Sequence, residues 1–243
     1  YERLRRRNDS ITDWEQVLAL TPDKAANRQP RRDARRRIVH LLYRSGKSRL
    51  RSRVRSWENE FNATPKNINS GYYLVEAHQK TGNLDKARSV LESLAELRPK
   101  DTSVLDELVK VYRAQREFDK AVELLLALAS KSPGRERDYF NQIAEIKTEL
   151  QQDDEAIDYV RRALEKSPND PVAYQRLAER YEAMQKPDEA IKAYEKVVEL
   201  APRKFNTYFI LAKLYINRGE RDRAASLYQL VLQRASNQEV LHK

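Results

Sequence analysis

The residues that could do chemistry in this sequence are few, and their spacing forms no recognisable catalytic site. The three histidines are His40, His78 and His242, and no two of them have the spacing of a helical metal-binding pair. The sequence has no cysteine, no glycine-rich phosphate loop and no Gly-x-Ser-x-Gly elbow. Acidic pairs such as Asp153-Asp154 stand where helices are expected to start, and capping explains them. We therefore expect no enzyme activity, no metal site and no cofactor.

Arginine is the residue type whose distribution does point to chemistry. Residues 28–55 contain 12 basic residues and a single acid, Asp33. Residues 1–65 carry a net charge of +9, whereas the remaining 178 residues carry only +1. Guanidinium groups suit phosphate and carboxylate recognition better than ammonium groups do. The candidate anion-binding residues are Arg35, Arg36, Arg49, Arg51 and Arg55.

This basic segment leaves several interpretations open. Its target could be nucleic acid, an anionic lipid surface or an acidic surface of the parent protein. Aromatic residues among the arginines are limited to Tyr43 and Trp57, which gives little support for base stacking. Alternatively, the segment is a solvated pair of helices, or it contacts the acidic middle of the chain or a neighbouring molecule. Nucleic-acid binding would appear as submicromolar affinity that falls steeply with salt.

A regular repeat dictates the elements that must position these side chains. One alanine marks each copy, with spacings of 34 or 35 residues, and one proline closes each copy with the same spacings. The alanines are Ala87, Ala121, Ala156, Ala190 and Ala224, and the prolines are Pro65, Pro99, Pro133, Pro168 and Pro202. An aspartate stands two residues before each alanine, where it can cap free N–H groups and favour the helix dipole. A fixed period of this size predicts a stacked array of supersecondary units.

Each regular copy is predicted to hold two helices joined by a tight turn. Gly82 and Gly219 stand in such turns, where a left-handed residue ends the first helix. Before the regular copies, residues 1–22 read as the second helix of a truncated repeat, with its helical pattern over 11–20. Residues 23–30 read as a polar connector, and helices over 31–44 and 47–62 form a degenerate, arginine-rich repeat over 31–67. The regular repeats are 68–101, 102–136, 137–170, 171–204 and 205–238, followed by a tail at 239–243.

This period and pattern resemble the tetratricopeptide repeat (TPR) family. The family's first-helix tyrosine falls on His78, Tyr112, Lys147, Tyr181 and Tyr215, and its first bulky aromatic falls on Gly71 in the first regular copy. The resemblance implies an all-α fold, a right-handed superhelical solenoid of antiparallel helix pairs. It also implies that the tyrosines at 174, 181, 194, 208, 215 and 228 pack between repeats. The shared positions are packing positions, so they say little about function.

What the resemblance implies for function is a non-enzymatic scaffold that binds a protein segment or peptide along the first helices. In this family the first helices line a concave groove. The corresponding residues are Tyr72, Glu76, Asp106, Lys110, Arg113, Asn141, Glu145, Gln175, Glu179, Asn206, Phe209 and Lys213. Acids outnumber bases among the inward positions, and Phe209 and Ile216 add an apolar spot. The expected partner is therefore basic or polar. An ordinary solvated face is the alternative.

The sequence leaves other functional classes open. Chaperone-binding members of the family hold a C-terminal carboxylate with lysine and asparagine, but Glu76, Glu145 and Glu179 occupy such positions here, so we expect no binding of chaperone tails. Residues 56–61 faintly resemble the half-a-tetratricopeptide units of RNA-processing proteins, which favours the nucleic-acid alternative. A third hypothesis is a docking domain of a larger enzyme.

The composition says little about the cellular location of the protein. No window approaches 18 consecutive apolar residues, so no transmembrane helix is expected. We expect a soluble protein and favour the cytoplasm. The chain begins at Tyr1 and ends within a helical pattern, and we expect it to be part of a longer protein.

Overall fold

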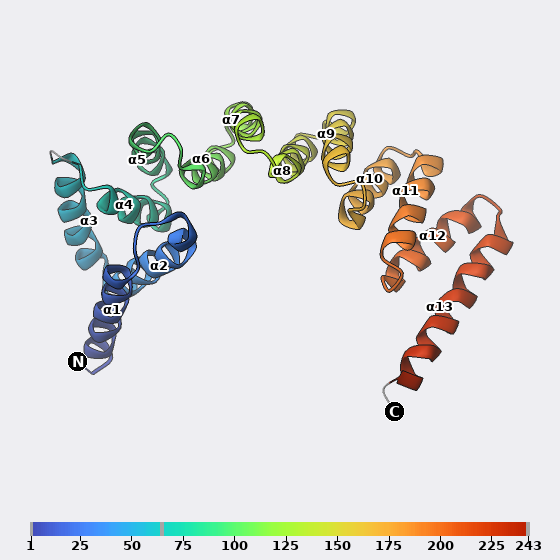
Figure 1. The fold of residues 1–243 in the computed structure, drawn as a ribbon, viewed down its shortest axis with the longest axis horizontal. Helices are drawn as coiled ribbons and strands as arrows, with labels where there is room; N and C mark the ends of the chain where they lie inside the picture. Colours follow the sequence, from blue (N-terminus) through green and yellow to red (C-terminus); the bar gives the residue numbers. More distant parts are fainter. Residues whose placement is uncertain (1, 64–65, 242–243) are drawn as a thin grey trace. The chain divides into compact units, whose positions relative to one another are not determined.

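The computed structural model describes residues 2–63 and 66–241, and every regular element in them is helical. Tyr1, Pro65 and His242, named above, lie outside these residues. The chain forms two compact units, residues 1–124 (unit 1) and residues 125–243 (unit 2), and each is described by itself (Figure 1). The boundary between the units falls within helix α7 (Phe118–Lys131).

Unit 1 contains successive antiparallel helices before α7. They are α1 (Glu2–Leu20), the short 3-10 helix η1 (Ala25–Asn27), α2 (Arg28–Ser45), α3 (Lys47–Asn62), α4 (Ile68–Thr81), α5 (Leu84–Leu97) and α6 (Thr102–Ala114). Helix α4 is central, because it packs against α2, α3 and α5 (Figure 1). Helix α1 begins nine residues before the predicted start at residue 11. The predicted connector 23–30 is also shorter, because Pro30 lies in the first turn of α2, where the missing N–H is tolerated.

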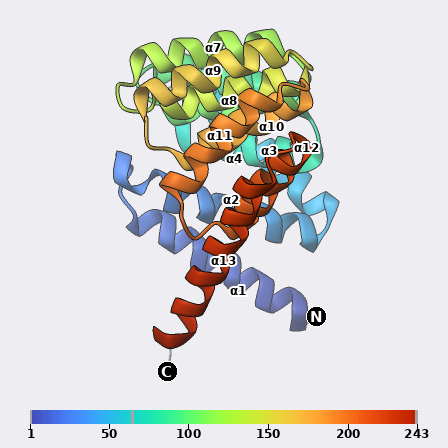
Figure 2. The same ribbon diagram turned by 90° about the vertical axis from the view of Figure 1, so that its right-hand side faces the viewer.

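Unit 2 repeats one arrangement along its length. Its helices after α7 are α8 (Glu136–Glu149), α9 (Asp153–Lys166), α10 (Pro171–Ala183), α11 (Pro187–Leu200), α12 (Phe205–Asn217) and α13 (Arg221–Leu241). Each first helix packs against its own second helix, and that second helix packs against the first helix of the next pair. Figure 2 shows α9 lying alongside α8. Helix α13 runs to Leu241 and so includes part of the predicted tail.

The turns within the helix pairs recur with the repeat period. Gly82 and Gly219 have positive φ angles of 76° and 82°, as their turn positions predict. Arg116, Gln151 and Gln185 stand at the equivalent places in the other pairs, and they also have positive φ, between 55° and 61°. The turn geometry is therefore the same in all five pairs, although only two of them place glycine there.

Aspartate caps are found at the first helices α6 and α10, and not at the second helices α5 and α11, where the sequence predicted them. Asp101 and Asp170 accept hydrogen bonds from the backbone N–H groups that start α6 and α10. Asp85 and Asp188 instead lie inside the first turn of α5 and α11, whose N-cap residues make no side-chain hydrogen bond. A residue already inside the helix cannot cap it, so these acids act on the helix dipole.

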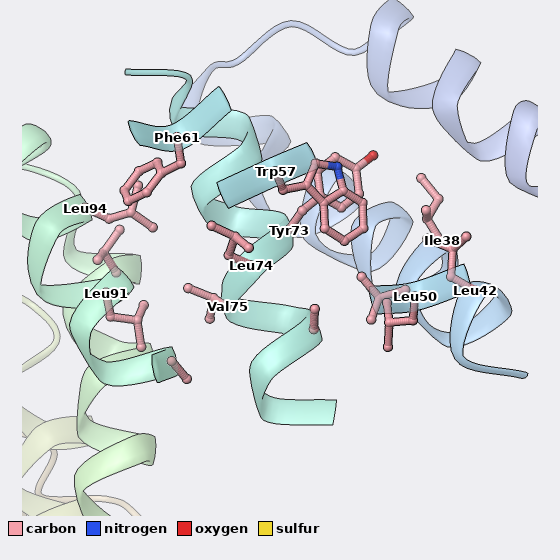
Figure 3. Packing of buried hydrophobic residues seen from close by; sticks show 14 of the residues in the cluster. Ile38, Leu42, Leu50, Trp57, Phe61, Tyr73, Leu74, Val75, Leu91 and Leu94 are labelled. Atoms are coloured by element: carbon pink, nitrogen blue, oxygen red, sulfur yellow. The ribbon is translucent and has the colours of Figure 1, made fainter. Parts of the chain in front are cut away.

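The cores follow the packing positions of the repeat. The marker alanines are 0–2% exposed, which lets the two helices of a pair approach closely. In unit 1, the rings of Trp57 and Tyr73 stack with centroids 4.5 Å apart (Figure 3). A Cβ atom on Gly71 would lie 2.6 Å from the Phe61 ring. Phe61 of α3 thus fills the space that a bulky residue at position 71 would need.

Most of the repeat tyrosines in unit 2 are buried, as packing residues are expected to be. Tyr181, Tyr194, Tyr208 and Tyr215 are between 1% and 7% exposed. Tyr228 differs, because 38% of its surface is exposed.

Candidate functional site

The arginines of α2 form ion pairs with the first helices of the two following repeats in unit 1. Arg32 lies 2.6 Å from Glu107 of α6 and 3.3 Å from Glu76 of α4. Arg36 lies 3.4 Å from the other oxygen of Glu76, and Arg28 lies 3.2 Å from Asp101 at the start of α6. Glu76 is only 8% exposed, so these contacts neutralise a buried carboxylate.

Arg35 is buried between α2 and α4. It is 6% exposed, its guanidinium lies 4.5 Å from the centre of the Tyr72 ring, and its Nη1 donates to Asn69. Burial, and then the charge of Arg31, lower the pKa of the Arg35 guanidinium from its usual value. The Tyr72 hydroxyl donates to Asp101 at 3.0 Å, and burial together with Asp101 raises the pKa of Tyr72 to about 12. Tyr72 therefore stays a protonated donor at neutral pH.

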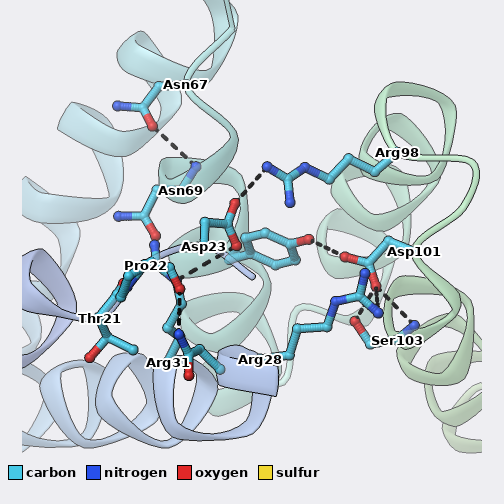
Figure 4. Close-up of polar contacts among 12 residues, drawn as sticks. Thr21, Pro22, Asp23, Arg28, Arg31, Asn67, Asn69, Arg98, Asp101 and Ser103 are labelled. Atoms are coloured by element: carbon cyan, nitrogen blue, oxygen red, sulfur yellow. Dashed lines mark hydrogen bonds and ion pairs between the residues drawn. The ribbon is translucent and has the colours of Figure 1, made fainter. Parts of the chain in front are cut away.

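The segment that joins α1 to α2 is fixed to the loop before α6. Arg98 donates to Asp23 at 2.6 Å, and Arg31 donates to the carbonyl of Thr21 (Figure 4). Arg31 also donates to the carbonyl of Leu18 at 3.1 Å. Burial would raise the pKa of Asp23, but the hydrogen bond and charge of Arg98 outweigh it, and the pKa is lowered. A cavity of about 80 Å³ lies among this segment, Tyr72 and Glu107. In unit 1, therefore, α2 and the residues before it cover much of the first-helix face on α4 and α6.

In this arrangement the predicted peptide-binding residues of unit 1 already have partners within the chain. Tyr72 and Glu76 contact α2, and Lys110 pairs with Glu107 at 2.6 Å. Asp106 and Arg113 are half-buried, and both have interaction partners. Arg35, a candidate anion-binding residue, is too buried in this arrangement to contact an external anion, because it packs on Tyr72.

In unit 2 the predicted residues lie on α8, α10 and α12. Glu145 pairs with Arg176 at 3.0 Å, and the Oδ1 atom of Asn141 is buried without a hydrogen-bond donor in the described residues. Gln175 donates to Glu179 at 2.7 Å and accepts a hydrogen bond from Lys204. Glu179 is exposed, as are Asn206 and Lys213.

The apolar spot predicted on α12 extends further than the sequence indicated. Phe209 and Ile216 are 46% and 45% exposed. The Phe209 ring lies 5.9 Å from the ring of Tyr228, which was expected to be covered. The period assigns Tyr228 to packing, so no sequence signal marked it as exposed.

The basic residues of α3 divide between two faces. Arg49 donates to Asn8 and Arg53 to Glu15, so both are tied to α1. Lys47, Arg51 and Arg55 line the other face, beside a pocket of about 460 Å³. The sequence indicated Arg51 and Arg55 as anion-binding candidates and placed Lys47 in the basic segment. It gave no sign of the pocket, because the other side of the pocket comes from residues 78–86.

Within the described residues, no group of His, Asp and Glu side chains could hold a metal ion. None of the helices that the structure describes is both long enough and apolar enough to span a lipid bilayer.

The paired helices and their packing residues define a tetratricopeptide repeat protein, an all-α helical repeat solenoid. A sequence profile described as tetratricopeptide repeat matches residues 70–101. A crystal structure of MamA superposes with a TM-score of 0.53 at 22% identity, over 68% of this chain and 96% of that chain. MamA 41-end from Desulfovibrio magneticus RS-1 gives 0.50 at 16% identity, over 76% and 97%. These similarities confirm the predicted all-α helical repeat fold.

A second profile identifies the family within this class. The profile of ChAPs (Chs5p-Arf1p-binding proteins) matches residues 101–230, which is more than half of the chain. The chain therefore belongs to the ChAPs family. No curated protein matches the sequence significantly.

Proposed function

We propose that this protein is a non-enzymatic scaffold that binds a basic protein segment on the first-helix face of unit 2. This face, formed by α8, α10 and α12, is called the unit 2 docking face. The main support is that the two units differ in the exposure of their first-helix faces. In unit 1 the equivalent residues Tyr72 and Glu76 are covered by α2, whereas Glu179, Phe209 and Lys213 of unit 2 are exposed.

The charge of the unit 2 docking face supports a basic partner. Glu145 and Glu179 stand on neighbouring first helices, Glu145 in its ion pair with Arg176, and the only base among the predicted residues of this face is Lys213. Opposite charges across an interface favour association and suppress wrong partners. Phe209 and Ile216 give the same face an apolar contact, which a large apolar side chain of the partner would cover.

Unit 1 supplies an example of this chemistry within the chain. There, an amphipathic helix rich in arginine lies on a first-helix face and pairs with Glu76 and Glu107. We expect the partner of unit 2 to resemble α2 in charge and amphipathic character. The name of the ChAPs family describes proteins that bind Chs5p and Arf1p, which supports a protein partner for this chain as well.

The test is a calorimetric titration of the full chain with a peptide of residues 28–45. We expect saturable binding, and none for the same peptide with its arginines replaced by glutamate. Glu145→Lys/Glu179→Lys should weaken binding by about tenfold or more, because it reverses the charge that attracts the peptide. Phe209→Ala/Ile216→Ala should weaken it through lost apolar contact.

The matched control is Glu165→Lys/Glu189→Lys, which makes the same charge change on α9 and α11. Both glutamates are exposed, and neither pairs with a cation among the described residues. Circular dichroism checks that every variant folds. An equal loss of affinity in this control, or no binding by the wild-type chain, would refute the unit 2 docking face.

A further inference from the structure

Helix α3 carries a row of cations that the protein itself does not neutralise. Lys47, Arg51 and Arg55 follow one another at intervals of four residues, so they lie on one face of the helix. Among the described residues, none of the three has an ion pair or a side-chain hydrogen bond. Arg49 and Arg53, between them in sequence, do have partners on α1. The unpaired charge is thus confined to one face.

This row borders the pocket of about 460 Å³ between α3 and the region from His78 to Lys86. Leu50 and Val54 give the pocket an apolar side, and Tyr43, whose ring centre lies 5.5 Å from the Lys80 ammonium, lines it as well. Thr81 and Asn83 add groups that can form hydrogen bonds. The volume lies in the range of about 300–1,000 Å³ that is common for small-molecule sites.

The electrostatic balance of the pocket is positive. Four lining residues are cations, namely Lys47, Arg51, Arg55 and Lys86, and Glu58 is the only acid. Glu58 already pairs with Lys86 at 3.6 Å. Burial and the charge of Lys86 lower the pKa of His78, so its imidazole is neutral at pH 7 and adds no charge.

The start of α3 adds a second feature that favours anions. Gly46 is the N-cap residue, and no side chain caps the helix. The first N–H groups of a helix lack partners within the helix, and together with its dipole they attract negative charge. Lys47 stands at this end of the row and lines the pocket.

We propose that this pocket binds an organic polyphosphate of nucleotide size. Its phosphates would lie along Lys47, Arg51 and Arg55, and its ring would contact Tyr43 and Val54. A single phosphate would leave part of the row unpaired and the apolar side uncovered, so the geometry favours several phosphates joined to a ring. This site lies in unit 1 and is independent of the unit 2 docking face.

The experiment is calorimetric titration of the full chain with adenosine triphosphate at low salt, without magnesium. We expect saturable binding with one site for each chain. Arg51→Gln/Arg55→Gln should weaken it by about tenfold or more, because hydrogen bonds to charged groups are the strong ones. Tyr43→Ala should weaken the binding of adenosine triphosphate but not that of inorganic triphosphate.

The matched control is Lys24→Gln/Lys100→Gln, which removes two other exposed cations of unit 1. Neither lysine has a side-chain partner among the described residues, and binding should stay within about twofold of wild type, since isolated surface charges contribute little. Tryptophan fluorescence verifies folding, and Lys47→Gln supplies an independent second variant. The proposal fails if the wild-type chain shows no saturable binding at millimolar nucleotide, or if the control loses as much affinity as Arg51→Gln/Arg55→Gln. It also fails if a mixed-sequence 12-residue oligonucleotide binds while the free nucleotide does not.

Discussion

Gly71 is a single position where this chain departs from its own repeat for a visible steric reason. A Cβ atom there would lie 2.6 Å and 2.9 Å from two ring atoms of Phe61 and 3.0 Å from Leu94. Phe61 and Leu94 are buried in the core of unit 1 (Figure 3). A larger residue at 71 and an aromatic ring at 61 therefore exclude each other.

Gly71→Ala is predicted to destabilise unit 1 by about 1–3 kcal/mol, because overpacking a dense core forces neighbours to move. Both tryptophans, Trp14 and Trp57, lie in unit 1, so their fluorescence during urea denaturation reports its unfolding. In the double variant Gly71→Ala/Phe61→Leu, the smaller side chain should relieve part of the cost. Strictly additive effects of the two substitutions would contradict the steric account.

His78 should make the stability of unit 1 depend on pH. Burial, and then Lys86, lower the pKa of His78 from 6.5 in the folded chain. Below pH 6.5 the unfolded chain binds the proton more readily, so the free energy of unfolding falls as the pH decreases toward the lowered pKa.

The pH prediction is tested with His78→Gln, which cannot titrate. Between pH 7 and pH 5, urea denaturation followed by tryptophan fluorescence should show a smaller loss of stability for the variant than for wild type. Parallel losses in the two proteins would mean that His78 does not carry the effect.

The turn inside each helix pair contains one residue in the left-handed backbone conformation, whether or not that residue is glycine. Gln185 adopts φ of 55° and Gly219 adopts φ of 82° in equivalent turns of unit 2. Both are exposed, and no heavy atom lies within 4 Å of a Cβ built on Gly219. The two positions therefore differ only in how easily their residue type adopts the left-handed backbone conformation.

Gln185→Gly is predicted to stabilise unit 2 by about 1 kcal/mol, and Gly219→Ala to destabilise it by about as much, because the left-handed region penalises a Cβ atom. Thermal unfolding followed by circular dichroism measures both. A Gln185→Gly variant that is less stable than wild type would show that the glutamine side chain contributes more than its backbone strain costs.

The repeat markers predicted most helices well because they are local packing positions. Ala190 and Pro202 constrain their own helix and its end, and the structure places α11 at Pro187–Leu200. The pairing of the basic segment was not predictable to the same degree. Arg28 meets Asp101 and Arg32 meets Glu107 across more than 70 residues of sequence, and no periodic pattern relates those positions. The same holds for Arg35, whose burial depends on how α2 packs on Tyr72.

In the molecule as a whole, the positive charge of residues 1–65 divides into a paired group and an unpaired group. Part of it is neutralised internally by ion pairs on α4 and α6, and part of it faces outward on α3. Arg32 belongs to the first group, with its side chain 23% exposed between Glu76 and Glu107. Arg36 is a weaker member, because 55% of its side chain is exposed.

Arg32→Ala should lower the free energy of unfolding of unit 1 by about 1–3 kcal/mol, because it leaves two partly buried carboxylates short of a partner. Arg36→Ala should cost less than about 1 kcal/mol, as exposed ion pairs do. Urea denaturation by fluorescence compares them. An equal effect of the two substitutions would contradict the ranking by burial.

A basic segment is expected to bind the unit 2 docking face and not the covered first-helix face of unit 1. Hydrogen exchange of the full chain, with and without the peptide of residues 28–45, tests it most directly. We expect slower exchange in α10 and α12 when the peptide is bound, with exchange in α4 and α6 unchanged. Slower exchange confined to α4 and α6, or no change anywhere in unit 2 at saturating peptide, would contradict it.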